Sequence, residues 1–120
     1  MADFDLVISG GTLVTATDTM EADLAVKGGQ IVAIGRGLGR PANTVDARGK
    51  LVLPGGIDTH AHIEQISGMG ATNADSFESA TKAAAAGGTT SVICFAPQHR
   101  GMSLTKVMED YHAKARRGAV

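Results

Sequence analysis

The sequence changes character at Pro54-Gly55-Gly56, and this change constrains the fold more than any other feature. Before it, short apolar or β-branched segments are separated by glycine pairs, which is typical of β-strands joined by tight turns. Gly10-Gly11 is predicted to turn the chain, and Gly28-Gly29 to form a hairpin. We expect strands over residues 4–9, 12–17, 23–27, 30–34, 44–46 and 50–53. Residues 1–53 therefore predict the N-terminal part of a small β-sandwich.

After this point, strand and helix patterns alternate. We expect a strand over 57–62, a loop over 63–74, a helix over 77–86, a strand over 89–96 and a helix over 103–117. Asp75 followed by Glu78 resembles a capping box, and Gly87-Gly88 is predicted to end the first helix. The nearly continuous apolar run of the second strand suits a strand covered on both faces. Residues 54–120 thus predict the start of an α/β fold with parallel strands.

The composition excludes several classes of function. The 120 residues carry a formal net charge of -1, and their 43% hydrophobic content is sufficient for a packed core. Nucleic acid and anionic membranes are therefore poor partners, and the basic residues near the C-terminus suit the last turn of a helix. A single cysteine, no signal-peptide pattern and no long apolar run lead us to expect a soluble cytoplasmic protein.

Two histidines stand one residue apart at the end of the first strand of the second section. Residues i and i+2 of a strand point to the same face, so His60 and His62 are predicted to aim at one point. Neutral imidazole is a common zinc ligand, and catalytic zinc sites use about three protein ligands plus water. Asp58 precedes them on the same face, where it is expected to orient a ligand or act structurally. The pair is a candidate metal site.

Other candidates carry weaker signals. A bare His-x-His is more often two ordinary histidines, and it is the apolar strand and the adjacent Gly55-Gly56 that favour a site here. His99 follows the second strand but is expected to be a loop residue, and His112 is expected to be exposed on a helix. Cys94 lies in a predicted buried strand and is expected to behave as a small hydrophobe.

Residues 52–62 read Val-Leu-Pro-Gly-Gly-Ile-Asp-Thr-His-Ala-His. This segment resembles the first barrel strand of the cyclic amidohydrolases in the amidohydrolase superfamily, most of all the dihydropyrimidinases and hydantoinases. Residues 4–14, 29–35 and 83–90 support the resemblance, which runs over nearly the whole chain in order.

The resemblance implies a (β/α)₈ TIM-type barrel beside a small β-sandwich. It implies that His60 and His62 bind the more buried zinc of a two-metal centre, whose metal-activated water opens small cyclic amides such as dihydropyrimidines and hydantoins. It further implies a homo-oligomer, and a loop after the first strand that shapes the substrate pocket, with Gln65, Ile66 and Met69 as candidate contacts.

The chain departs from this pattern in length. A complete barrel takes about 250 residues, and only two of its eight βα units are present. The remaining family ligands are a carboxylated lysine, two histidines and an aspartate that acts as the general base, and all of them are expected downstream. We therefore expect an amino-terminal portion that is inactive alone. A dihydroorotase or N-acyl-amino-acid deacylase portion, and a non-catalytic relative that binds metal or a partner, stay open as alternatives.

Overall fold

The structure of the chain is a computed structural model that describes residues 2–120. It divides into two compact units, one up to Pro54 and the other from Gly55 onward. Among the described residues, no helix has both the length and the apolar character needed to cross a membrane.

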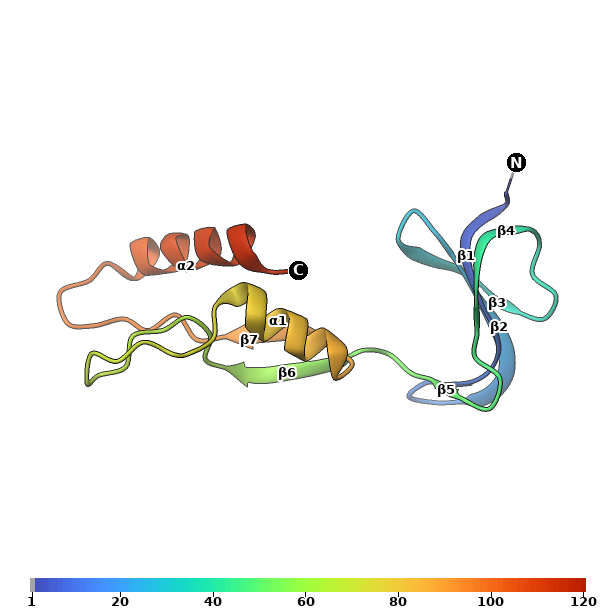
Figure 1. The fold of residues 1–120 in the computed structure, drawn as a ribbon, viewed down its shortest axis with the longest axis horizontal. Helices are drawn as coiled ribbons and strands as arrows, with labels where there is room; N and C mark the ends of the chain where they lie inside the picture. The colour runs from blue at the N-terminus through green and yellow to red at the C-terminus, as the bar shows by residue number, and fades with distance from the viewer. Residues whose placement is uncertain (1) are drawn as a thin grey trace. The chain divides into compact units, whose positions relative to one another are not determined.

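The first unit contains one mixed β-sheet (Figure 1). Its strands are β1 Phe4–Val14, β2 Thr19–Lys27, β3 Gln30–Gly35, β4 Pro41–Asp46 and β5 Leu51–Val52. The order is β3-β2-β1-β4, with β5 beside the far end of β1. β2 is antiparallel to its two neighbours, whereas β4 and β5 run parallel to β1. Leu13, Ala22 and Leu24 form the buried centre of this unit.

The turn predicted at Gly10-Gly11 is wrong, because β1 continues through it with a β-bulge. Ile8 pairs with Leu24 and Gly11 with Ala22, so two residues of β1 lie opposite Asp23 alone. Gly10 has a φ of 72°, and its N–H donates to Oδ1 of Asp23 at 2.8 Å. Among the interactions that lower the pKa of Asp23 below its ordinary value of 3.8, this hydrogen bond has the largest effect. The carboxylate thus replaces the strand partner that the bulge removes.

Two other boundaries follow from pairing between distant segments. The hairpin at Gly28-Gly29 is confirmed: both glycines have positive φ, as a two-residue type I′ turn requires, and Lys27 pairs with Gln30. β4 begins at Pro41, earlier than predicted, because residues of low strand propensity there pair with β1 from Phe4 onward.

The second unit contains β6 Gly56–Ala61, α1 Phe77–Ala86, β7 Thr89–Cys94 and α2 Leu104–Gly118 (Figure 1). β6 and β7 are parallel, which confirms the strand–helix–strand arrangement predicted for this section. The core consists of Ala61 and Ile63 packed with Phe77 of α1 and Tyr111 of α2.

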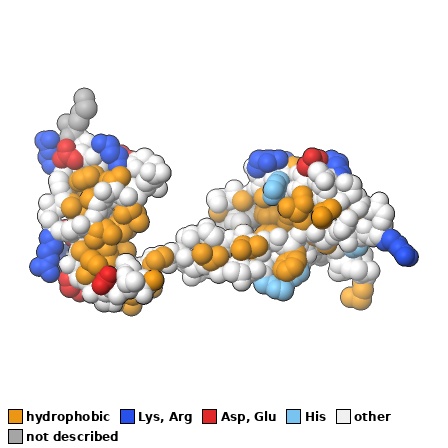
Figure 2. All heavy atoms as spheres, turned by 180° about the vertical axis from the view of Figure 1, so that it is seen from behind, with side chains coloured by type: hydrophobic (Ala, Val, Ile, Leu, Met, Phe, Trp, Pro, Cys, Tyr) orange, Lys and Arg blue, Asp and Glu red, His pale blue; other side chains and the backbone are white. Residues whose placement is uncertain are grey.

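Within residues 2–120, β7 is covered on one face rather than on both. Val92 and Cys94 pack against the helical core, whereas Ile93 between them is 58% exposed. The reason is that both helices pack on the same side of the β6–β7 pair. Hydrophobic side chains remain on the surface of both units, as Figure 2 shows.

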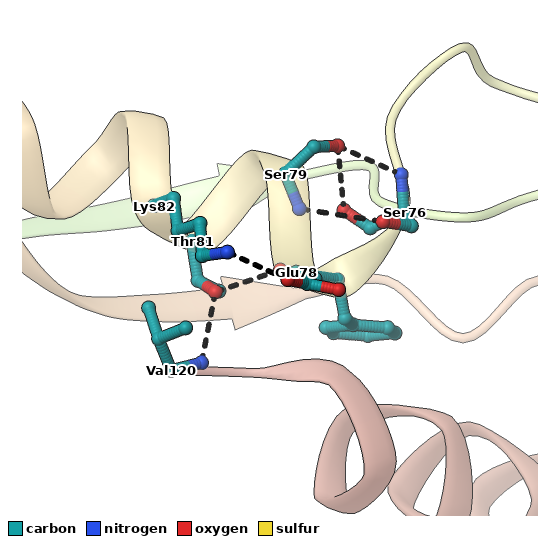
Figure 3. Close-up of polar contacts among 7 residues, drawn as sticks. Ser76, Glu78, Ser79, Thr81, Lys82 and Val120 are labelled. Atoms are coloured by element: carbon teal, nitrogen blue, oxygen red, sulfur yellow. Dashed lines mark hydrogen bonds and ion pairs between the residues drawn. The ribbon is translucent and has the colours of Figure 1, made fainter.

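The capping box of α1 lies one residue later than predicted. Oγ of Ser76 accepts from the N–H of Ser79 at 3.3 Å, and Oγ of Ser79 accepts from the N–H of Ser76 at 3.1 Å (Figure 3). Asp75 instead accepts from the Ser79 hydroxyl at 2.8 Å, and Glu78 forms an ion pair with Lys82. Two short hydroxyl side chains satisfy the end of the helix, which leaves Glu78 free for its i,i+4 partner.

Candidate metal site

His60 and His62 lie where β6 ends, and their rings approach each other. The two Nε2 atoms are 3.1 Å apart, and the ring centroids are separated by 5.1 Å. The pairing of β6 with β7 is irregular between Asp58 and Ala61, so the ladder is interrupted where the histidines emerge. The structure thus brings together the two nitrogens that the alternation of the strand predicted.

This separation fits two donor atoms of one metal ion. Two nitrogens bound to zinc at about 2.0–2.1 Å in tetrahedral geometry lie about 3.3 Å apart, close to the separation of the two Nε2 atoms. Within residues 2–120, no cluster of three or more histidine, cysteine or acidic side chains is arranged to hold a metal. The two imidazole nitrogens therefore have a spacing suited to one shared ion, and no third such side chain joins them within residues 2–120.

The side chain of Gln65 contacts Nδ1, the second ring nitrogen of His62. Its Oε1 lies 2.9 Å from Nδ1 of His62, and its Nε2 donates to the backbone carbonyl of Phe95 at the end of β7. The Gln65 side chain is buried, and its backbone N–H donates to Oδ1 of Asn73 at 2.8 Å. The loop after β6 is in this way attached both to the histidine and to the neighbouring strand.

Phe95 packs against both imidazoles. Its ring is stacked on His62 and tilted against His60, with centroid distances of 4.9 and 4.5 Å. Its N–H donates to the carbonyl of Ala61 at 3.0 Å, which continues the pairing of β6 with β7. Our sequence analysis missed this residue. The available signal was its place as the last large apolar residue of the second predicted strand, at the same sheet end as the histidines.

Asp58 contacts the backbone of the site rather than a ring. Its Oδ1 accepts from the N–H of His60 at 3.0 Å, and this hydrogen bond restricts the backbone of β6 at the first histidine. Nearby, burial raises the pKa of the Cys94 thiol, and the charge of Asp58 adds to this shift. A protonated thiol packed against the helical core agrees with the view of Cys94 as a small hydrophobe.

The three loop residues predicted to contact substrate occupy different surroundings. Gln65 and Met69 line a hollow together with His62, and Met69 is 94% exposed. Ile66 lines a second hollow with His99, and Gln65 borders this hollow too. His112 lies on α2 beside a third hollow.

Comparison with known proteins places these features in a family. Residues 51–115 match the Amidohydrolase family. The chain is 45% identical to the D-hydantoinase of Ralstonia pickettii over 111 residues, which are 92% of this chain and 24% of that protein. It is 46% identical to the dihydropyrimidinase of Rattus norvegicus over 112 residues, 88% of this chain and 21% of that protein.

A solved structure is similar as well. The crystal structure of D-hydantoinase from Bacillus sp. AR9 matches 96% of this chain and 25% of its own, with a TM-score of 0.90 and 46% identity. The chain spans about a quarter of the length of the relatives that it matches. The relatives are hydrolases, and the range 51–115 that matches the family contains positions 60 and 62 of this chain. This chain belongs to the amidohydrolase family.

Proposed function

We propose that this chain is the amino-terminal portion of a zinc-dependent hydrolase that opens cyclic amides such as hydantoins and dihydropyrimidines. The observation that carries the proposal is the 3.1 Å separation of the Nε2 atoms of His60 and His62 at a strand end. The similarity to a D-hydantoinase and a dihydropyrimidinase supports the substrate class.

In this proposal, His60 and His62 hold the more buried ion of a two-zinc centre. Zinc bound there supplies Lewis-acid polarisation of the amide and activation of a water molecule. The two imidazoles supply neutral nitrogen donors from one rigid strand end, and Asp58 fixes the backbone of the first. The remaining ligands and the general base belong to parts of the protein outside these 120 residues, so the chain alone is inactive.

The surroundings of β6 and β7 support a larger barrel. Ile57 and Ile93 are 65% and 58% exposed, and a two-stranded parallel sheet leaves both outer edges without partners among the described residues. We propose that further βα units of a (β/α)₈ barrel cover this face, and that the first unit forms the N-terminal part of a small β-sandwich. The 120 residues expressed alone are expected to self-associate in light scattering, and a clean monomer at micromolar concentration would contradict this.

The loop after β6 is proposed to shape the substrate pocket. Ile66 and Met69 are exposed apolar side chains in this loop, suited to contact a ring substituent. Met69→Ala is expected to change KM among hydantoins with different substituents and to leave zinc content unchanged.

The test of the proposed function is metal content together with ring-opening activity of the complete protein on hydantoin and dihydrouracil. His60→Ala and His62→Ala are each expected to lose zinc and activity. His99→Ala and His112→Ala serve as controls that retain both. Unchanged zinc content in His60→Ala would overturn the ligand assignment, whereas zinc without ring opening would favour a non-catalytic metal-binding relative.

A further inference from the structure

Gln65 is the one polar residue with a buried side chain among residues 2–120, with 8% of its surface exposed. Both polar groups of its amide have partners, one on each of two strand ends. Burial of an amide is costly unless its oxygen and nitrogen find hydrogen-bond partners, and here each of the two atoms has one.

The orientation of the amide follows from the chemistry of its partners. The carbonyl of Phe95 accepts hydrogen bonds and cannot donate, so the amide nitrogen of Gln65 must face it. The amide oxygen then faces His62, 2.9 Å from Nδ1. The assignment of nitrogen and oxygen in this side chain is thereby fixed by a backbone group rather than by the histidine.

The tautomer of His62 follows in turn. An amide oxygen only accepts, so Nδ1 of His62 must carry the proton that it donates. In a neutral imidazole the other nitrogen is then a bare acceptor, which places the lone pair of Nε2 toward His60. Histidines that bind metal through one nitrogen commonly donate the N–H of the other to an oxygen in this way.

We infer that Gln65 is a positioning residue, which keeps His62 in the tautomer protonated at Nδ1 and presents Nε2 to a metal ion. The metal part of this inference rests on the proposed function, whereas the tautomer does not. The hydrogen bond from Nε2 of Gln65 to the carbonyl of Phe95 fixes the orientation of the amide. An acidic side chain of the same length would still accept from Nδ1 but would lose the hydrogen bond to Phe95, whereas an apolar side chain would lose both contacts and would favour neither tautomer of His62.

The test compares the complete wild-type protein with Gln65→Met, which removes both polar groups, and Gln65→Glu, which keeps an oxygen opposite Nδ1. Long-range ¹H–¹⁵N correlation of zinc-free protein labelled at histidine reports which ring nitrogen carries the proton. His62→Asn assigns the signals, and zinc affinity is measured by competition with a chelator.

Wild type is expected to show His62 protonated at Nδ1, and Gln65→Glu to match it. Gln65→Met is expected to populate both tautomers of His62 and to bind zinc about 10- to 100-fold more weakly. An unchanged tautomer in folded Gln65→Met would overturn the inference. Wild type that fails to bind zinc would instead overturn the proposed function, and the tautomer measurement would still decide the role of Gln65.

Discussion

The rings of Phe95 and His62 are stacked, with an interplanar angle of 5° and centroids 4.9 Å apart. The same phenyl ring lies 4.5 Å from the centroid of His60, at an angle of 49°. One residue at the end of β7 therefore restricts the orientation of both imidazoles at the end of β6.

Phe95→Leu is expected to weaken zinc binding about 2- to 10-fold, because contacts between aromatic rings contribute about 0.5–1.5 kcal/mol beyond the area that they bury. The backbone of residue 95 stays, so the hydrogen bond from Gln65 is retained. Chelator competition measures the affinity. Ile93→Ala is the control, since Ile93 is a large apolar residue of the same strand. Equal losses in both variants would assign the effect to the strand as a whole.

Gly55 and Gly56 are predicted to differ sharply in their tolerance of alanine. A Cβ at Gly55 would lie 2.0 Å from Oγ1 and 2.7 Å from Cβ of Thr90, whereas the nearest atom to a Cβ at Gly56 is 3.4 Å away. Overpacking of this kind costs about 1–3 kcal/mol. Gly55→Ala should lower the free energy of unfolding by this amount in urea titrations, and Gly56→Ala should change it far less.

A second variant tests the cause of that loss. Thr90→Ala removes the two closest atoms, so adding it to Gly55→Ala should recover part of the stability. No recovery in the double variant would show that contact with Thr90 is not what excludes a side chain at Gly55.

How far the sequence predicts the structure depends on the range of the interactions involved. α1 was predicted over 77–86 and is found there, because serine, alanine and glycine signals next to one another determine where it begins and ends. The glycine pair at Gly10-Gly11 failed as a turn signal, because a turn and a bulge need the same backbone freedom. The choice between them depends on Asp23 in the neighbouring strand.

The candidate site shows the same difference between local and long-range interactions. Alternation along one strand was sufficient to predict that His60 and His62 face one point. The link from His62 through Gln65 to Phe95 was not predicted, because it joins residues 30 positions apart that meet only when β6 and β7 pair. Local pattern was thus sufficient to bring the two imidazoles together, and only the folded sheet shows which residues orient them.

Ser76→Ala is expected to lower the free energy of unfolding by about 1 kcal/mol, because it removes the acceptor that caps α1 (Figure 3). Glu78→Ala removes only an exposed i,i+4 ion pair with Lys82 and should cost about 0.3–0.5 kcal/mol. Thermal unfolding of both variants measures the difference. A larger loss in Glu78→Ala than in Ser76→Ala would instead support the capping box of Asp75 and Glu78 that the sequence pattern indicated.

Asp46 is expected to have a pKa well below the ordinary value of an aspartate. Hydrogen bonds from the Arg48 side chain, and then from its backbone N–H, lower the pKa of Asp46 to about 2 from an ordinary value of 3.8. The guanidinium Nη2 lies 2.6 Å from Oδ2 of the carboxylate. Because the folded-state pKa is depressed, the pair contributes stability above the ordinary pKa, and this contribution is lost as the pH falls toward 2.

Carboxyl ¹³C titration by NMR measures this pKa directly. Arg48→Ala should return the pKa of Asp46 toward 3.8, whereas Lys50→Ala, which removes only a more distant charge, should move it much less. Since both partners are exposed, the change in unfolding free energy should be small and should shrink further with added salt. An Asp46 that titrates near 3.8 in the wild-type protein would show that the pair does not persist in solution.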